Sequence, residues 1–336
     1  MKRAISGPGR GLGILGMAVV VAQISLAHAR AQEVSWPLRP ITMIAPFAAG
    51  GPVDVVGRVV AAALAEKLGK PVIVENIGGA GGMIGSARAA KAEPDGYTIV
   101  MGNVGTHAGN QTLYRHPLYD AAKDFAPVAL IVQLPLVLVA RKDFPASDLK
   151  SFIAYAKAHA STLQFGSGGT GSTTHLACAL LNSATGITAV HIPYKGGGPA
   201  MQDLIAGRID YLCIDPPVAR PQIQAGTVKA IAVLSRERSS SLPALATAEE
   251  QGAKNIDINN WFALFAPKGT DPAVVKKLHD ATVAAMETET LQRQMKQIGA
   301  ELVAPERRSS AYLAAFVQSE IEKWAGPIKA GGLHAD

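Results

Sequence analysis

Charged and aromatic residues are scarce in this sequence of 336 residues, and each shortage excludes a class of protein. Charged residues make up 17% and aromatic residues 5%, which fits neither a coiled coil nor a surface that stacks nucleic-acid bases. Hydrophobic residues at 48% exclude a disordered chain. The first 31 residues hold four of the Lys and Arg residues and no Asp or Glu, so the net charge of +6 falls to +2 without them. A surplus this small predicts no nucleic-acid partner.

Cysteine is almost absent, since the chain has only Cys178 and Cys213. Neither has a second Cys or a His at ligand spacing, so we expect no metal site. Each lies inside an apolar run, LACALL and YLCID. We expect two buried thiols, and a disulfide is the alternative if the chain is exported.

The N-terminal segment has the layout of a secretory signal peptide at residues 1–31. A basic start is followed by an apolar run at residues 12–26 and by small-x-small sequences that predict cleavage after Ala29 or Ala31. A membrane anchor is the alternative, but about 15 apolar residues fall short of the roughly 20 that span a bilayer. We therefore expect an exported chain, in the periplasm if the source is Gram-negative.

Short apolar runs then alternate with amphipathic segments. Apolar spacing, Gly and Pro predict strands at 41–46, 71–75, 97–101, 163–166, 190–192, 211–214, 230–234 and 261–266. The helices are predicted at 53–68, 83–92, 149–159, 174–184, 199–206, 272–287, 289–298 and 309–329. Alternating strands and helices indicate parallel α/β sheets covered on both faces.

The long apolar segment at 128–139 suggests where the chain changes sheet. It contains Pro135, which cannot sit in a central ladder, so we predict two strands or one bent strand. The terminal helices bring almost no strands of their own and must cover the first sheet. We therefore predict an α/β venus-flytrap fold, type II-like, with two hinge-crossing strands. Lobe 1 comprises residues 32–138 and 262–336, and lobe 2 comprises residues 139–261.

A Gly-rich loop at residues 47–54 follows the first strand of lobe 1. Its glycines permit close approach of a ligand, and the helix behind it offers unpaired N–H groups and a positive dipole end. Asp54 either caps that helix or contacts a polar ligand. The candidate ligand-binding residues here are Phe47, Ala48, Ala49, Gly50, Gly51 and Asp54.

A second loop, residues 166–175, joins a strand to a helix in lobe 2. Its hydroxyls and backbone amides suit a carboxylate or phosphate oxygen, and a well-capped turn is the alternative. Each loop follows the carboxyl end of a strand, where ligands bind in open α/β sheets. The candidates are Ser167, Gly168, Gly169, Thr170, Ser172 and Thr173. His107, after the third strand, either faces the same cleft or is an ordinary loop residue.

Motifs of enzymes and nucleotide-binding proteins are missing. The cluster at residues 78–82 does not match GxGxxG, and no GxxxxGK[ST], GxSxG or HExxH occurs. Ser172 and His175 lie three residues apart, but no nearby carboxylate orients the histidine. We therefore expect no enzyme and no cofactor, and keep a phosphate-handling enzyme as a minor alternative.

Ordered motifs along the chain resemble the Bug family, the substrate-binding proteins of tripartite tricarboxylate transporters. The matching stretches are Trp36-Pro37, Pro40-Ile41, Pro46-Phe47-x-Ala49-Gly50-Gly51-x-x-Asp54, Val74-Glu75-Asn76, Gly81-Gly82-x-Ile84-Gly85, Pro94-Asp95-Gly96-Tyr97-Thr98, Gly105-Thr106-His107, Lys123-Asp124-Phe125-Ala126-Pro127-Val128, Ser172-x-x-His175-Leu176, Pro193-Tyr194-Lys195-Gly196, Gly207-x-x-Asp210 and Trp261-Phe262-x-Leu264-Phe265-Ala266-Pro267-x-Gly269-Thr270. The resemblance extends from Trp36 to about Leu333.

The resemblance implies a periplasmic protein, expected to be monomeric, that captures a small carboxylate and delivers it to membrane transporter subunits. A di- or tricarboxylate, an aromatic acid or an acidic amino acid would fit. The two loops would grip the carboxylate through backbone amides and water, and Thr106, His107 and Asp215 would face the cleft. Pro52-Val53 replaces a more usual Gly and Thr, and neither loop contains Arg, which favours a ligand of modest charge. A ligand sensor for a sensor kinase is the alternative function.

Overall fold

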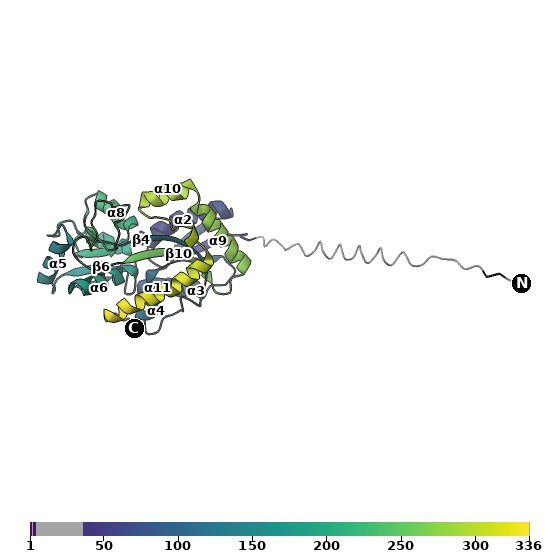
Figure 1. The fold of residues 1–336 in the computed structure, drawn as a ribbon, viewed down its shortest axis with the longest axis horizontal. Coiled ribbons are helices and arrows are strands. Elements are labelled where there is room, and N and C mark those ends of the chain that lie inside the picture. Colours follow the sequence, from purple (N-terminus) through teal and green to yellow (C-terminus); the bar gives the residue numbers. More distant parts are fainter. Residues whose placement is uncertain (2, 5–35, 336) are drawn as a thin grey trace. The chain divides into compact units, whose positions relative to one another are not determined.

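The computed structural model describes residues 1, 3–4 and 36–335, of which residues 37–335 form the unit considered below (Figure 1). The predicted signal peptide and its cleavage point lie outside the described residues. Within the described part of the chain, no helix combines the length and the apolar character needed to cross a membrane.

Ten strands form two five-stranded sheets in this unit. The first sheet has the order β2-β1-β3-β10-β4, with β1 (Ile41–Ala45), β2 (Val72–Asn76), β3 (Thr98–Asn103), β4 (Phe125–Pro135) and β10 (Asn259–Pro267). The second has the order β7-β6-β8-β5-β9, with β5 (Val137–Arg141), β6 (Gln164–Ser167), β7 (Val190–Pro193), β8 (Tyr211–Ile214) and β9 (Val228–Val233). We call the elements around these sheets lobe 1 and lobe 2.

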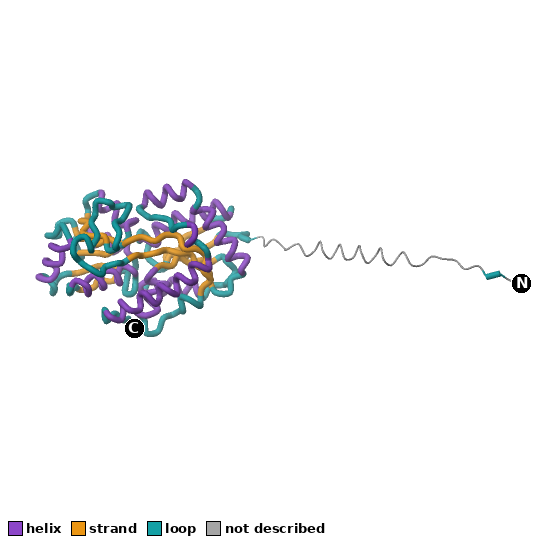
Figure 2. Tube along the Cα trace, in the orientation of Figure 1, coloured by secondary structure: helices purple, strands orange, loops and turns teal. Residues whose placement is uncertain are grey.

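Helices lie on both sides of the strands, as Figure 2 shows. Lobe 1 contains α2 (Pro52–Leu68), α3 (Met83–Ala90), α4 (Asn110–Leu113), α9 (Pro272–Met286), α10 (Glu289–Ile298) and α11 (Ser310–Ala330), with short helical turns at Ala80–Gly82, Gly105–Gly109 and Pro305–Arg307. Lobe 2 contains α5 (Leu149–Ala158), α6 (Thr173–Thr185), α7 (Gly197–Ile205) and α8 (Pro216–Gln224). The helices that were predicted agree with these bounds to within a few residues, whereas α4 and the short helical turns were not predicted.

The expectation of parallel sheets was wrong for one strand in each sheet. β10 is antiparallel to β3 and β4, and β5 is antiparallel to β8 and β9. Each of these is the first strand after the chain crosses between lobes. Each crossing strand therefore enters its sheet from the opposite end and runs in the opposite direction to its neighbours. The two sheets have the same order as a result, with the crossing strand fourth in each.

The chain changes sheet at two neighbouring points, where the hinge was predicted. β4 ends at Pro135 and β5 begins at Val137, so the predicted break at the proline is confirmed. Leu136 N–H donates to Ile258 O at 3.3 Å, and Ile258 N–H donates to Leu234 O at 2.6 Å. The return crossing therefore precedes Asn259, a few residues before the predicted position near 262.

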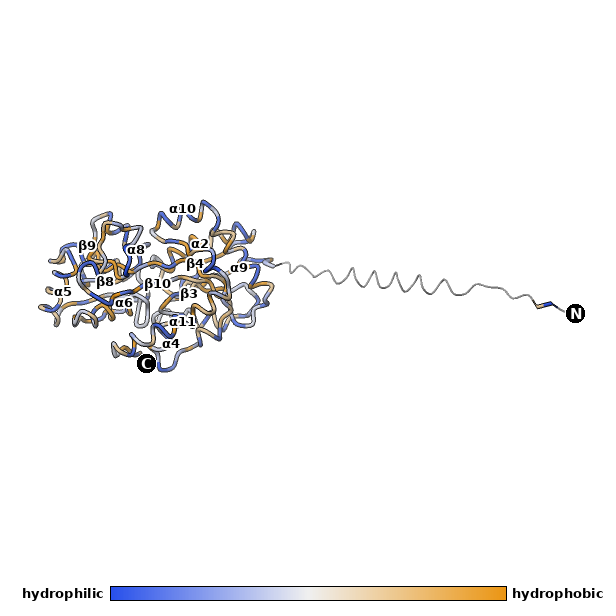
Figure 3. The backbone as a smooth tube through the Cα atoms, viewed as in Figure 1, coloured by the Kyte–Doolittle hydropathy of each residue, from blue (hydrophilic) through white to orange (hydrophobic). Residues whose placement is uncertain are grey.

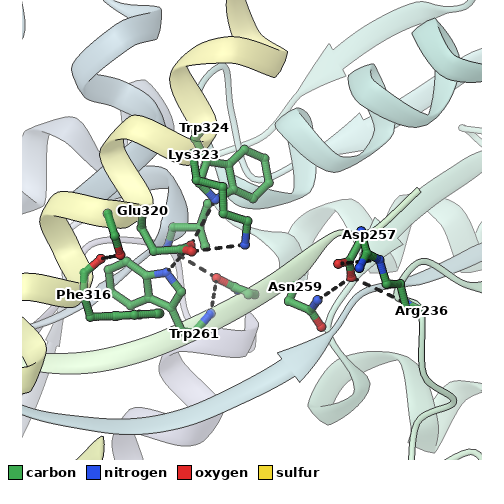
Figure 4. A network of polar contacts seen from close by, with 11 residues as sticks. Arg236, Asp257, Asn259, Trp261, Phe316, Glu320, Lys323 and Trp324 are labelled. Carbon is green, nitrogen blue, oxygen red and sulfur yellow. Dashed lines mark hydrogen bonds and ion pairs between the residues drawn. The ribbon is translucent and has the colours of Figure 1, made fainter. Parts of the chain in front are cut away.

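The terminal helices cover the first sheet, since α9 and α11 both pack on β4. Figure 4 shows how α11 also holds the crossing strand β10. Glu320 Oε2 accepts hydrogen bonds from Trp261 Nε1 at 2.9 Å and from Trp324 Nε1 at 3.1 Å. Glu320 is buried, and Lys323 Nζ lies 3.1 Å from its other oxygen. The buried carboxylate thus has the partners that a buried charge needs, and it holds the start of β10 against α11.

Burial explains why these segments become strands. Every residue of β8 is buried, as are residues 260–267 of β10, and Figure 3 shows apolar chain concentrated in the strands. Lobe 2 has its own core, in which Val139 of β5, Leu204 of α7 and Leu212 of β8 are packed together. Side-chain caps start the helices around it. Asp148 forms a capping box at α5, and Ser172 caps α6 by accepting from His175 N–H.

The expectation of two free thiols was wrong, because Cys178 and Cys213 form a disulfide. Cys178 lies in α6 and Cys213 in β8, with their Cα atoms 5.4 Å apart. The two positions are 35 residues apart in sequence and meet only because α6 packs on β8. Apolar neighbours in the sequence predict that a cysteine is buried, but they do not predict which residue it contacts.

Candidate functional site

A small cavity lies between the lobes, at the carboxyl ends of β3, β6 and β8. Its walls are Phe47, Pro52, Val53, Asn103, Gly168, Ser172, Thr173, Thr174, Gly197, Asp215 and Asn260. The centre of a water-sized sphere can move within only about 20 Å³ of it, room for about one water molecule. Both lobes contribute walls, so this volume depends on how far they are closed.

Direct hydrogen bonds show that the lobes are closed on the cavity. Ala48 N–H donates to Lys195 O at 2.9 Å, and Tyr114 Oη donates to Thr170 O at 3.0 Å. Gly105 N–H donates to Thr173 Oγ1 at 3.0 Å. Each of these bonds joins lobe 1 to lobe 2, so an opening of the hinge would break them.

Of the six candidate residues in the first predicted loop, Phe47 alone lines the cavity, beside Pro52 and Val53 of the same loop. Its neighbours meet lobe 2 through their backbone instead. A Cβ atom on Gly51 would lie 3.3 Å from Gly197 N, and Gly50 has a φ of +77° that favours glycine. With the bond from Ala48, residues 48–51 thus form part of the contact between the lobes.

Asp54 holds the first loop in shape and does not line the cavity. It is buried and accepts hydrogen bonds from Gly50 N–H and Asn76 Nδ2, both at 2.9 Å, and an ion pair with Arg58 at 2.8 Å. Burial alone would raise the pKa of Asp54, but these bonds, from Arg58 first, lower it below the usual value. The residue that caps α2 is Gly51, so the capping role considered for Asp54 does not match its contacts.

The second predicted loop supplies Gly168, Ser172 and Thr173 to the cavity. Gly168 N–H donates to Thr174 Oγ1 at 2.8 Å, and Ser172 Oγ lies 3.0 Å from the same oxygen. Thr174, the next residue of α6, also lines the cavity. The first turn of a helix has N–H groups with no partner inside the helix, so α6 presents both hydroxyls and a positive dipole end here.

The other residues of that loop support it from outside the cavity. Ser167 Oγ accepts from Gly169 N–H at 3.0 Å and lies 2.6 Å from His191 Nε2. Thr170 contacts lobe 1 through its carbonyl, as described above. These three candidates therefore hold the loop in place.

Thr106 and His107, which we expected to face the cleft, are not among the walls of this cavity. Both are fully buried in lobe 1. The His107 ring stacks on Phe265 with centroids 4.0 Å apart, and its Nδ1 lies 2.9 Å from Thr106 Oγ1. Burial lowers the pKa of His107 to about 3, so the ring is neutral. The segment is a helical turn packed against α11, which directs these side chains into the core.

Two asparagines in the cavity were not predicted. Asn103 is the last residue of β3, and its Oδ1 accepts from Thr106 N–H at 3.0 Å. No described residue accepts a hydrogen bond from its Nδ2, which leaves two N–H groups for a ligand. Its place at the end of a strand was a signal for it. Asn260, inside the crossing strand β10, had no such signal.

Among the described residues that line the cavity, Asp215 is the only one with an ionisable side chain. It directly follows β8, is 1% exposed, and accepts from Asn260 Nδ2 at 2.8 Å. Burial raises the pKa of Asp215 to about 7, although the bond from Asn260 works in the opposite direction. No Arg, Lys or His of the described residues lines the cavity. An anion held here would therefore be bound by neutral donors and the α6 dipole.

Two sheets of equal order, joined by two crossing segments around a cavity, define a two-lobed periplasmic-binding-protein fold. A family model described as tripartite tricarboxylate transporter family receptor (TctC) matches residues 56–333. The chain therefore belongs to this family of solute-binding receptors.

Solved structures agree with this assignment. A structure of the periplasmic binding protein BugD is 38% identical, covers 90% of this chain and 100% of its own, and superposes with a TM-score of 0.86. MatC of Rhodopseudomonas palustris, solved with bound malate, is 38% identical, with coverages of 87% and 100% and a TM-score of 0.85. R. palustris Rpa4515, solved with adipate, is 33% identical, with coverages of 89% and 99% and a TM-score of 0.85.

Proposed function

We propose that this protein is the periplasmic receptor of a tripartite tricarboxylate-type transporter, which captures a small carboxylate between its lobes and delivers it to the membrane subunits. Membership of the family and the malate and adipate of two similar structures support this. The observation that carries the proposal is the cavity itself. It is enclosed by both lobes and lined by neutral hydrogen-bond donors at the start of α6 and the end of β3.

The carboxylate would lie between Asn103 and the first turn of α6. One oxygen accepts from the free Nδ2 group of Asn103, and the other from the Ser172 hydroxyl or the Thr173 N–H group. Hydrogen bonds to an ionised acceptor are stronger than neutral ones, and the helix dipole favours the charge. Because these groups come from different lobes, binding favours the closed form.

A thermal-shift screen of the mature protein tests the binding function. The panel contains small carboxylates, with inorganic phosphate and neutral sugars as controls. A ligand at 100 times its Kd adds about 2.7 kcal/mol to the free energy of unfolding, which shifts Tm by several degrees. A shift from carboxylates alone supports the proposal. A shift from phosphate or sugars alone contradicts it.

A pair of variants connects the binding to the cavity. Asn103→Asp replaces the free donor with a charge that repels a carboxylate, so we expect the ligand-induced shift to disappear. Asn255→Asp is the matched control, since Asn255 is exposed and does not line the cavity. An equal ligand-induced shift in Tm in both variants would show that Asn103 does not contact the ligand.

Uptake measurements test the delivery step. A strain without the gene should lose uptake of the carboxylate found in the screen, and the intact gene should restore it. Normal uptake combined with a lost transcriptional response would instead favour the sensor alternative. Fractionation of the same strain checks that the protein is in the periplasm.

A further inference from the structure

Asp215 lines the cavity without a cationic partner among the described residues. Its carboxyl group accepts one hydrogen bond from another residue, from Asn260 Nδ2 to Oδ1 at 2.8 Å. The side chain is almost completely buried, and an ionised carboxylate that has no cation beside it is costly to bury. The position therefore favours the uncharged acid form of Asp215.

The two prolines that follow Asp215 remove the donors that usually stabilise a carboxylate at the start of a helix. Such a carboxylate accepts from the N–H group of the second or third helical residue. Pro216 and Pro217 occupy the first two positions of α8 and have no N–H group. The next two N–H groups, of Val218 and Ala219, donate to the backbone carbonyl of Asp215 at 3.1 Å. The Asp215 side chain consequently receives no capping hydrogen bond from α8.

The orientation of Asn260 decides which oxygen of Asp215 holds the proton. Trp261 N–H donates to Asn260 Oδ1 at 2.9 Å. Thr173 Oγ1 accepts from Gly105 N–H at 3.0 Å and donates to the same Asn260 oxygen at 3.3 Å. Because a backbone N–H can only donate, these contacts leave Nδ2 of Asn260 to face Asp215. Oδ1 of Asp215 is then an acceptor, and the proton lies on Oδ2, which no donor from another described residue reaches.

Charged groups on the surrounding elements do not reach Asp215. Burial is the largest cause of its raised pKa of about 7, and no charge among the described residues contributes. Five of the elements packed on β8 and α8, or α8 itself, carry titratable groups that bind elsewhere, namely Asp54 and Arg58 of α2 with each other, Arg141 of β5 with Asp143 and Asp210, Asp203 of α7 with Tyr194 and Arg208, Arg220 of α8 with carbonyls of α10, and Lys229 of β9 with Phe144 O. Burial lowers the pKa of His175 in α6 to about 3, so its ring is neutral, and Tyr211 of β8 donates to Asn182 Oδ1. The remaining groups on α2 and α10 are exposed, namely Glu66, Lys67, Glu289, Arg293 and Lys296.

We propose that Asp215 binds the ligand as a carboxylic acid, whose Oδ2–H donates a hydrogen bond to the ligand carboxylate, so that the closed receptor holds one proton at Asp215 for each ligand. This inference rests on the proposed function and adds a third donor to its site. With room for about one water molecule, the cavity brings a group held by Asn103 and α6 against Asp215 as well. The bound anion stabilises the acid form, since two carboxylates that share a site cannot both be ionised.

Above neutral pH the proton must come from solution. The ionised Asp215 of the free protein then takes one proton from water or buffer as the ligand anion binds, and the only covalent bond that forms is its O–H bond. Below neutral pH the proton is already in place, so binding involves no exchange. The affinity should therefore depend on pH even for a ligand whose own charge is constant.

Calorimetry at pH 6 and pH 8 tests this dependence with the best carboxylate from the screen, chosen so that every pKa of the ligand lies below about 5. With a pKa of about 7, the acid form of Asp215 makes up about nine-tenths of the free protein at pH 6 and about one-tenth at pH 8. We therefore expect the Kd to be roughly tenfold weaker at pH 8. Titrations in buffers of different ionisation enthalpy should show the uptake of close to one proton per ligand at pH 8 and almost none at pH 6.

A pair of aspartate variants assigns the effect to this carboxyl group. Asp215→Asn places an amide N–H donor where the Oδ2–H group lies, and the amide does not titrate. The ratio of Kd between the two pH values should fall from about ten to about one, and the proton uptake should disappear. Asp143→Asn is the matched control and should keep the parental ratio, since Asp143 is also in lobe 2 but is exposed and does not line the cavity.

The outcomes separate this inference from the proposed function. Release of a proton, or tighter binding at pH 8, would overturn the inference, because a cationic group of the ligand would then pair with ionised Asp215. Binding without proton exchange at pH 8, or a pH ratio that persists in Asp215→Asn, would also overturn it and leave the carboxylate receptor standing. If no carboxylate binds at either pH, the proposed function fails and the inference fails with it.

Discussion

Replacement of Gly81 by alanine should prevent the lobes from closing without touching the ligand. Gly81 lies in the helical turn Ala80–Gly82 of lobe 1, against the second loop of lobe 2. A Cβ atom there would lie 2.1 Å from Thr170 O and 2.7 Å from Ser172 N. Both neighbours are backbone atoms, which cannot rotate away as a side chain could. The clash therefore acts on the closed form and spares an open one.

The size of the effect follows from the contacts that closure makes. An ordinary Cβ contact begins near 3.4 Å, so Thr170 would have to withdraw by about 1.3 Å. A movement of that size breaks the bonds from Ala48 to Lys195, from Gly105 to Thr173 and from Tyr114 to Thr170. Each contributes about 0.5–1.5 kcal/mol. Together they total about 1.5–4.5 kcal/mol, which corresponds to a roughly 10- to 2,000-fold weaker affinity.

Calorimetry and small-angle scattering would measure this effect with the best carboxylate from the screen. For the parent we expect the radius of gyration to fall on ligand addition, and for Gly81→Ala we expect a weaker Kd and no fall. Gly69→Ala is the control, since Gly69 has a similar φ of +66° against +58° but no atom within 4 Å of an added Cβ. Backbone strain is thus matched, and only the clash differs. Parent-like affinity and compaction in Gly81→Ala would refute the reasoning.

Three further predictions concern lobe 2. Gly168→Val should abolish carboxylate binding, measured by calorimetry, because the two methyl groups of valine enter the cavity. The Tm without ligand should stay near that of the parent, since a Cβ atom at this position meets only ordinary contacts at 3.4 Å. Retained binding would contradict the placement of Gly168 in the ligand site. Reduction of the Cys178–Cys213 disulfide, which links positions 35 residues apart, should lower the free energy of unfolding by about 3–4 kcal/mol and Tm by several degrees. In a variant with both cysteines changed to alanine, the reductant should leave Tm unchanged. Because burial raises the pKa of Asp215 from 3.8 to about 7, the folded chain keeps a proton in this range that the unfolded chain has lost. The ligand-free protein should therefore lose up to a few kcal/mol as pH rises from about 4 to about 7, and Asp215→Asn should flatten this slope in Tm; an unchanged slope would assign the loss to another group.

Local patterns in the sequence determined the elements and the point where the chain leaves the first sheet. Helix α2 follows from apolar residues at helical spacing that end at Gly69, and its C-cap is indeed Gly69 in the left-handed region. The break at Pro135 follows from the missing N–H group of proline. These features depend on a residue and its near neighbours, so a single sequence contains them. The same holds for the loops at 47–54 and 166–175, where glycine and hydroxyl residues come between a strand and a helix.

The tertiary structure alone decided which loop residues reach the cavity and which hold the lobes together. Residues 48–51 contact lobe 2 through their backbone, and His107 is buried under α11, because the distance between the lobes and the packing of a distant helix set these positions. The direction of β10, the disulfide between α6 and β8, and the place of Asn260 in the cavity likewise join positions far apart in the chain. The periodicity of apolar residues in the sequence predicts whether a residue is buried. It does not predict which residue is contacted, because that contact depends on how the two lobes fold and close.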